Sequence, residues 1–257
     1  MNIPLYYLRH YQSIEKTFWN AICEHSIQIE QHTICYLTPL DSPIFNFIYL
    51  QPESTISALK QAHHLFIAQK KDHTLVIPEE MLQKVQGEVE LLGYKRDSVT
   101  TAMALALEKQ LSVELPKNQV DIVFANHDLA LWAKPLVSAF YIPDSNDQVI
   151  HEYVRYHEEA LLQGSPQFHL VLLVNGEPAT SMTVTIEGAI ARFDDIGTEI
   201  AHQGKGYATQ LIDYALAFCR QQNVEYCFLD ASEAGLGLYK KFGFEPLFRY
   251  INYVWCK

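Results

Sequence analysis

Cysteine is scarce and scattered in this sequence of 257 residues, which holds five cysteines in all. A disulfide framework needs paired cysteines in a small chain, and a zinc knuckle needs closely spaced ones. Here they are odd in number, far apart and never arranged as Cys-x-x-Cys. We therefore expect neither a disulfide framework nor a metal site, and we interpret all five as buried apolar thiols (Cys23, Cys35, Cys219, Cys227 and Cys256).

Basic runs and long apolar stretches are also missing. The chain carries 19 Lys and Arg against 30 Asp and Glu, a formal net charge of −11. Nucleic-acid phosphates and anionic membranes attract concentrated positive charge, so we expect neither as a partner. No stretch approaches the roughly 18 apolar residues of a membrane span, and the N-terminus lacks the pattern of a secretory leader. The sequence predicts a cytoplasmic protein whose electrostatic field favours a cationic substrate.

What the sequence does contain is a clear succession of strand and helix patterns in its second half. Between residues 168 and 200, three apolar-rich runs are separated by the turn signals Asn175-Gly176 and Glu187-Gly188. This pattern predicts an antiparallel meander with strands at 168–174, 179–186 and 189–200. After this meander, the spacing of the apolar residues changes to the three-to-four-residue period of a helix. The other expected elements are strands at 120–124, 224–229 and 248–255, and helices at 128–140, 144–162, 207–222 and 236–242.

The first half repeats parts of this pattern less clearly. We expect strands at 44–50, 74–77 and 100–107 and helices at 54–69 and 79–92. The best boundary is Leu115-Pro116-Lys117-Asn118, because a proline and a polar pair separate two patterned blocks there. We therefore predict two domains, residues 1–115 and 116–257, which can be structural repeats of each other. A single larger α/β domain is the alternative.

The segment from Gln203 to Ala208 lies between a strand and a helix, where a phosphate is bound most easily. The first amides of a helix lack internal partners, and glycines let the backbone approach an anion. The phosphate loop of nucleoside triphosphatases does not fit, because Gly204-Lys205-Gly206 is followed by Tyr. A dinucleotide fingerprint fits better, with Asp230 after the next strand, but Thr209 occupies its third glycine position.

A third interpretation accounts for more of the sequence. Gln203-x-x-Gly206-x-Ala208 resembles the pyrophosphate-binding motif of the GNAT superfamily of acyl-CoA-dependent N-acyltransferases, and Leu238-Tyr239-x-x-x-Gly243-Phe244 resembles a second motif of that family. The elements between 118 and 257 follow in the family's order. The resemblance implies a GNAT fold, an α/β architecture with a mixed sheet, and acetyl-CoA as cosubstrate without a metal.

The resemblance also implies which residues contact acetyl-CoA. The strand that ends near Ile200 would pair with the pantetheine arm, and the following loop would surround the pyrophosphate. Where the family often has Asn after the next strand, this chain reads Asp230-Ala231-Ser232, so Ser232 is either a pantetheine contact or a turn residue. The implied cofactor-binding residues are Thr198, Glu199, Ile200, Gln203, Gly204, Lys205, Gly206, Tyr207, Ala208, Thr209 and Ser232.

Two residues are candidates for proton transfer. Tyr239 matches a family tyrosine that protonates the leaving thiolate, although it can also be a packing residue. Family members use different bases. We choose Asp194, while Asp195 and Glu199 lie on the same strand and all three can be solvated side chains. Strand alternation predicts that Asp194 and Asp195 point to opposite faces of the sheet.

Together these observations predict an N-acetyltransferase that transfers an acetyl group to the primary amine of a small molecule or peptide. The alternative is a CoA-binding or interaction module of the same fold that has lost catalysis. Residues 1–115 lack the Gln-x-x-Gly-x-Ala loop, so we interpret them as a degenerate copy that covers the acceptor cleft or shapes its specificity.

Overall fold

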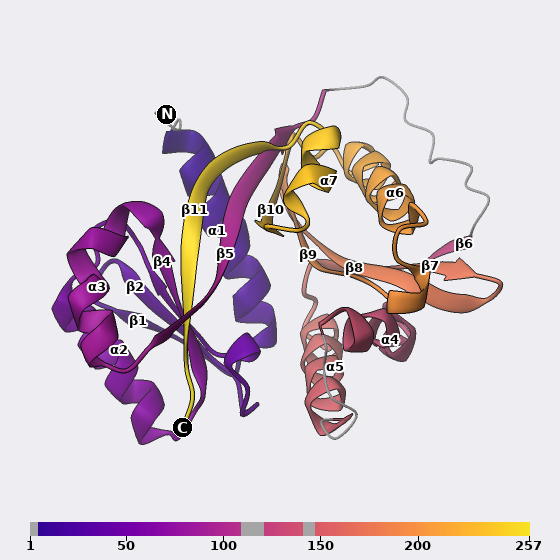
Figure 1. Cartoon of the computed structure of the whole chain (residues 1–257). Coiled ribbons are helices and arrows are strands. Elements are labelled where there is room, and N and C mark those ends of the chain that lie inside the picture. The colour runs from indigo at the N-terminus through magenta and orange to yellow at the C-terminus, as the bar shows by residue number, and fades with distance from the viewer. Residues whose placement is uncertain (1–4, 109–120, 141–146) are drawn as a thin grey trace. The chain divides into compact units, whose positions relative to one another are not determined.

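The computed structural model describes residues 5–108, 121–140 and 147–257, and the chain divides into two compact units (Figure 1). Unit 1 combines Met1–Ile22 with Ala104–Leu229, and unit 2 combines Cys23–Met103 with Asp230–Lys257. Each unit is therefore built from two separate stretches of the chain. The boundary predicted at residues 115–118 lies outside the described residues.

Unit 1 contains the predicted meander. Strands β6 (Asp121–Phe124), β7 (Gln167–Val174), β8 (Glu177–Glu187) and β9 (Ile190–Thr198) pair antiparallel, and β10 (Tyr226–Ser232) adds to β9 in parallel. Asn175 and Gly176 have φ of 53° and 82°, and two consecutive positive φ angles match the twist of a tight hairpin. These strands and the helices beside them confirm the elements predicted from 120 to 229.

Helices cover both faces of this sheet. Phe168 of β7 meets Phe218 of α6 (Tyr207–Gln221) with ring centroids 5.0 Å apart, whereas the next residue, His169, meets Trp132 of α4 (Leu129–Ala139) at 4.8 Å. Because successive strand residues face opposite sides, α6 and α4 lie on opposite faces (Figure 1). Helix α5 (Asp147–Leu162) packs beside α4.

The N-terminal helix α1 (Leu5–Ile22) was not predicted, yet it packs against α5, β8 and β9 of unit 1. Its buried side chains recur at helical spacing and include Tyr11, Ile14 and Phe18, which are at most 1% exposed. This periodicity is present in the sequence and could have identified the helix. Unit 1 therefore requires the first residues of the chain as well as its second half.

Unit 2 is a second α/β assembly. Its strands lie in the order β1 (His25–Ile29), β2 (Thr33–Leu37), β3 (Phe47–Leu50), β4 (His73–Pro78), β11 (Glu245–Trp255) and β5 (Lys95–Ala106). Strand β3 pairs with β4 in parallel, whereas β11 is antiparallel to β4. Strands β1 and β2 were not predicted. The C-terminal strand of the chain thus completes the sheet that residues 23–103 begin.

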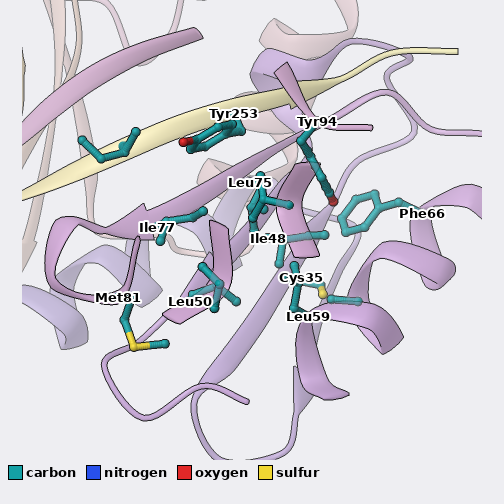
Figure 2. Packing of buried hydrophobic residues seen from close by; sticks show 14 of the residues in the cluster. Cys35, Ile48, Leu50, Leu59, Phe66, Leu75, Ile77, Met81, Tyr94 and Tyr253 are labelled. Atoms are coloured by element: carbon teal, nitrogen blue, oxygen red, sulfur yellow. The ribbon is translucent and has the colours of Figure 1, made fainter. Parts of the chain in front are cut away.

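Two helices of unit 2 pack on one hydrophobic core (Figure 2). Helix α2 (Ile56–Ala68) contributes Leu59 and Phe66, and α3 (Leu82–Leu91) contributes Val85. The side chains of Ile48 and Leu75 from β3 and β4 belong to the same core and are fully buried. The same hydrophobic cluster contains residues of α2, α3, β2, β3, β4 and β11. This shared core explains why unit 2 combines residues 23–103 with residues 230–257.

The cysteines differ in their surroundings. Three are buried, as predicted: Cys35, Cys219 and Cys227. Burial raises the pKa of the Cys35 thiol to about 12, so it stays protonated and apolar. The same expectation is wrong for Cys256, which is exposed next to the end of the chain, and Cys23 is of intermediate exposure. Of the helices in the described ranges, none has the length and apolar character to cross a membrane.

Candidate functional site

The candidate site begins where β9 loses one of its two neighbours. Strand β10 pairs with β9 from Ile190 to Phe193, whereas β8 continues to pair with β9 as far as Thr198. Over residues 194–198, β9 therefore has one hydrogen-bonded side, and its other edge has no strand partner within the described part of unit 1. An extended ligand can add its own main-chain hydrogen bonds to such an edge.

A β-bulge interrupts β9 at the start of this edge. The pairing with β8 shifts register between Ser181 and Thr183, and Asp195 has a φ of 51°. Asp tolerates this left-handed conformation better than most residues. The bulge cancels the alternation, so the prediction that Asp194 and Asp195 point to opposite faces is wrong. Asp194 contacts Arg192, whose guanidinium lies over a ring of α1, and Asp195 contacts Tyr153 of α5. Helices α1 and α5 pack on each other, so both carboxylates face the same layer of helices.

Asp194 is bound in an ion pair. Arg192 Nε lies 2.9 Å from Oδ1 and 3.0 Å from Oδ2 of Asp194. The arginine side chain is only 2% exposed, and its guanidinium lies 5.4 Å from the centre of the Tyr11 ring. A carboxylate in this position neutralises a buried cation, which is a structural task that competes with proton uptake from a substrate.

Asp195 has different surroundings. Its Oδ1 accepts a hydrogen bond from the Tyr153 hydroxyl at 2.8 Å, and its Oδ2 accepts one from the Thr183 hydroxyl at 2.8 Å. Burial raises the pKa of Asp195 to about 6, although these two bonds and the charge of Arg192 favour the ionised form. A carboxyl group with this pKa changes its protonation state close to neutral pH.

A histidine pair lies behind Asp195. His157 Nε2 is 4.0 Å from Asp195 Oδ2, and His157 Nδ1 is 2.9 Å from His169 Nε2. Burial holds the pKa of His157 well below its usual range and lowers that of His169 to about 3. Both imidazoles are therefore neutral at pH 7, and the His157 side chain is fully buried.

The loop after β9 has the geometry that an anion requires. Gly204 and Gly206 have φ of 73° and 81°, and Gly206 precedes α6 as its N-cap. The first helical bond runs from the amide of Gln210 to the Gly206 carbonyl at 3.1 Å. The amides of the first turn, Tyr207 to Thr209, precede this bond and point toward the helix N-terminus, where the helix dipole favours negative charge.

The other predicted residues of this stretch contact one another or neighbouring groups of unit 1. Gln203 Nε2 donates to the Thr198 carbonyl at 3.2 Å, and Lys205 Nζ donates to the Ala201 carbonyl at 2.9 Å. The Ile200 amide donates to Ser138 Oγ of α4 at 3.3 Å, and Glu199 lies 3.7 Å from His202. The structure therefore brings the residues from 198 to 209 together on one segment of unit 1.

Tyr239 and Ser232 belong to unit 2. Tyr239 lies in α7 (Leu236–Lys241), is 8% exposed, and packs 6.1 Å from the Phe244 ring. Ser232 Oγ accepts a hydrogen bond from the Gly235 amide at 3.1 Å, which is the turn role that the sequence offered as an alternative. The contacts of both residues with acetyl-CoA stay predictions.

Gly197 lets α4 approach β9 closely. A Cβ at this position would lie 2.8 Å from Leu136 Cδ2 and 3.0 Å from Ala139 Cβ. We expect Gly197→Ala to lower the free energy of unfolding by about 1–3 kcal/mol, the usual cost of overpacking, in urea denaturation. Gly87→Ala in α3 is the control, because no atom lies within 4 Å of its added Cβ and it should be neutral or stabilising. Equal effects of the two changes would contradict the close packing.

Sequence reasoning missed the residues that surround Asp195. Tyr153 and His157 lie one turn apart on α5 and Thr183 lies on β8, and together they form no recognised motif. The two adjacent aspartates were visible, but the bulge that turns both to the same helices depends on how β8 pairs with β9. No signal in the local sequence could have selected Asp195 over Asp194.

Comparisons with known proteins concern the family and the fold. Residues 135–244 match the model of the Acetyltransferase (GNAT) family. A GCN5-related N-acetyltransferase from Kribbella flavida is 14% identical with a TM-score of 0.63, covering 95% of each chain. One from Sphaerobacter thermophilus is 13% identical with a TM-score of 0.62, covering 89% of this chain and 82% of that one.

A tandem GNAT protein from the clavulanic acid biosynthesis pathway is also similar. It is 14% identical with a TM-score of 0.56, covering 87% of this chain and 78% of its own. At such identities the likeness shows the fold alone, and it confirms the predicted α/β GNAT architecture in tandem. No curated protein sequence matches this chain.

Proposed function

Because residues 135–244 carry a domain of the GNAT acetyltransferase family, we propose that the protein transfers the acetyl group of acetyl-CoA to a primary amine. The observation that carries the proposal is the loop from Gln203 to Ala208. Its two positive-φ glycines lead into the first-turn amides of α6, and the short 3-10 helix Ile200–His202 connects this loop to the unpaired edge of β9. This order suits a ligand with a pyrophosphate at one end and an extended amide-containing arm at the other.

In the proposed reaction the neutral amine attacks the thioester directly. The amine lone pair forms the new C–N bond, and the C–S bond breaks with its electron pair on sulfur. The attacking nitrogen must lose a proton, and the thiolate gains one. Tyr239 is the proposed proton donor, since a phenol with a pKa near ~10 is protonated at neutral pH. The acidic net charge of −11 supports a cationic acceptor, either a small molecule or a peptide.

The test is acetyl transfer to a panel of amines, followed by release of free CoA thiol. The panel should include polyamines, aminoglycosides, amino-acid derivatives and peptides with free N-termini or lysines. Thiol release that depends on both acetyl-CoA and an amine supports the proposal. A Tyr239→Phe variant that keeps the full turnover number would contradict the role of Tyr239 alone.

A CoA-binding module without catalysis is the second candidate. It is favoured by the ion pair that occupies Asp194, the base chosen from the sequence. Acetyl-CoA that raises the melting temperature while every amine in the panel is left unmodified would support this candidate instead. Stabilisation by NAD(H) but not by acetyl-CoA would contradict both.

A further inference from the structure

A group of polar side chains is buried on the side of the unit 1 sheet that α4 and α5 cover. We infer that Gln167 of β7, Thr185 of β8 and His157 of α5 form a binding site for internal water, which holds about two molecules between the strands and the helix. The inference goes beyond the proposed acetyl transfer and does not depend on it, because it concerns the folded protein without any substrate.

The Gln167 side chain provides the strongest observation. The residue is 2% exposed, and both its amide nitrogen Nε2 and its amide oxygen Oε1 are buried without a hydrogen-bond partner among the described residues. The main chain beside it does not need this amide, because Asn126 donates to the Gln167 carbonyl and accepts from the His169 amide, each at 2.8 Å. An unpaired buried amide is costly. Gln167 therefore needs partners other than the described side chains.

Thr185 adds a third polar atom next to this amide. It lies directly opposite Gln167 in the pairing of β7 with β8. The Ile186 amide bonds the Pro166 carbonyl at 3.0 Å, so the adjacent pair of Gln167 and Thr185 is of the non-hydrogen-bonded kind, in which side chains approach most closely. Thr185 is fully buried, and its hydroxyl also has no partner in the described ranges.

His157 contributes a fourth atom from the covering helix. Gln167 and His169 point to the same face of the sheet, and His169 Nε2 lies 2.9 Å from His157 Nδ1. Burial holds the pKa of His157 well below its usual range, and the Gln167 amide acts in the opposite direction, so this amide faces the imidazole. His157 Nε2 is buried and forms no hydrogen bond within the described part of unit 1, and Asp195 Oδ2 is 4.0 Å from it.

The mixture of donors and acceptors indicates that the ligand is water. The Gln167 nitrogen only donates and its oxygen only accepts, whereas the Thr185 hydroxyl does both. A cation would leave the amide N–H groups unpaired, and an anion would leave the amide oxygen unpaired. A buried water molecule donates and accepts, and it makes about three hydrogen bonds to polar groups that would otherwise be unsatisfied. Because the amide nitrogen and oxygen point in different directions, about two molecules are needed to serve both.

The experiment detects bound water by NMR in the full-length protein. We expect cross-peaks between water and the side-chain amide protons of Gln167, with the sign of a dipolar contact instead of that of chemical exchange. Loss of the resonances in Gln167→Met assigns them. The cross-peaks should weaken in Thr185→Val and persist in Thr33→Val. Thr33 is the matched control because it is also a fully buried strand threonine, but its hydroxyl donates to Ser54 Oγ at 3.0 Å.

The stability of Gln167→Met gives an independent measurement. Where water binds the amide, the change removes the partners of that water and should lower the melting temperature by about 2–4 °C. An amide that is truly unpaired predicts the opposite sign, because methionine has a similar shape and no group that requires a hydrogen bond. The inference would be overturned by a raised melting temperature in Gln167→Met, or by the absence of water cross-peaks from Gln167 in the unchanged protein.

Discussion

Replacing Gly204 and Gly206 together by alanine should weaken acetyl-CoA binding by at least about 100-fold. Both glycines have φ between 73° and 81°, a region that costs an L-residue about 1–2 kcal/mol. Alanines relax out of it and turn the loop amides away from the phosphates. Each hydrogen bond to a charged group contributes about 1.5–3 kcal/mol, so the loss of two accounts for the change. The measurements are the KM for acetyl-CoA and the dissociation constant of CoA.

Gly164→Ala with Gly176→Ala is the matched control. These glycines have φ of 79° and 82°, and no atom lies within 4 Å of a Cβ added at any of the four positions. Both double variants therefore carry similar backbone strain and should lose similar stability. Only the change at 204 and 206 should affect CoA. An equal affinity for CoA in the two double variants would show that the loop does not bind the pyrophosphate.

Arg192→Met should lower the free energy of unfolding by about 3–5 kcal/mol. The change leaves the carboxylate of Asp194, which is 12% exposed, without its closest cation, and an enclosed charge without its partner is costly. The variant also loses the contact of the guanidinium with the Tyr11 ring of α1. The free energy of unfolding is measured by urea denaturation, and an unchanged m-value shows that the variant differs from the unchanged protein in stability alone.

Two further variants show whether the cost comes from the unpaired charge. Arg155→Met removes an arginine that is 43% exposed and pairs with Glu152 and Glu159, and surface pairs contribute at most about 1 kcal/mol. Adding Asp194→Leu to Arg192→Met removes the charge that was left behind and should restore much of the stability. If Arg192→Met costs no more than Arg155→Met, the buried ion pair is not what holds this region together.

The sequence also predicted much of the candidate site, but unevenly. The loop from Gln203 to Ala208 could be located from its residues alone, since glycines between a strand and an amphipathic helix form a local pattern. The expected directions of the Asp194 and Asp195 side chains rested on strand alternation, which holds only for regular pairing. The β-bulge at Asp195 breaks that regularity, and it arises from the register between β8 and β9. The directions of these two carboxylates were therefore the least predictable feature of the site.

The sequence by itself determined the meander, the glycine loop before α6 and the order of helices and strands that indicates a GNAT domain, because hydrophobic periodicity and turn residues act over a few neighbouring positions. Only the tertiary structure decided that α1 packs with unit 1, that β11 pairs with β4 in unit 2, and that Tyr153 and Thr183 meet at Asp195. These contacts join residues far apart in the chain. Their stability comes from mutual burial and hydrogen bonding, which local sequence patterns do not encode.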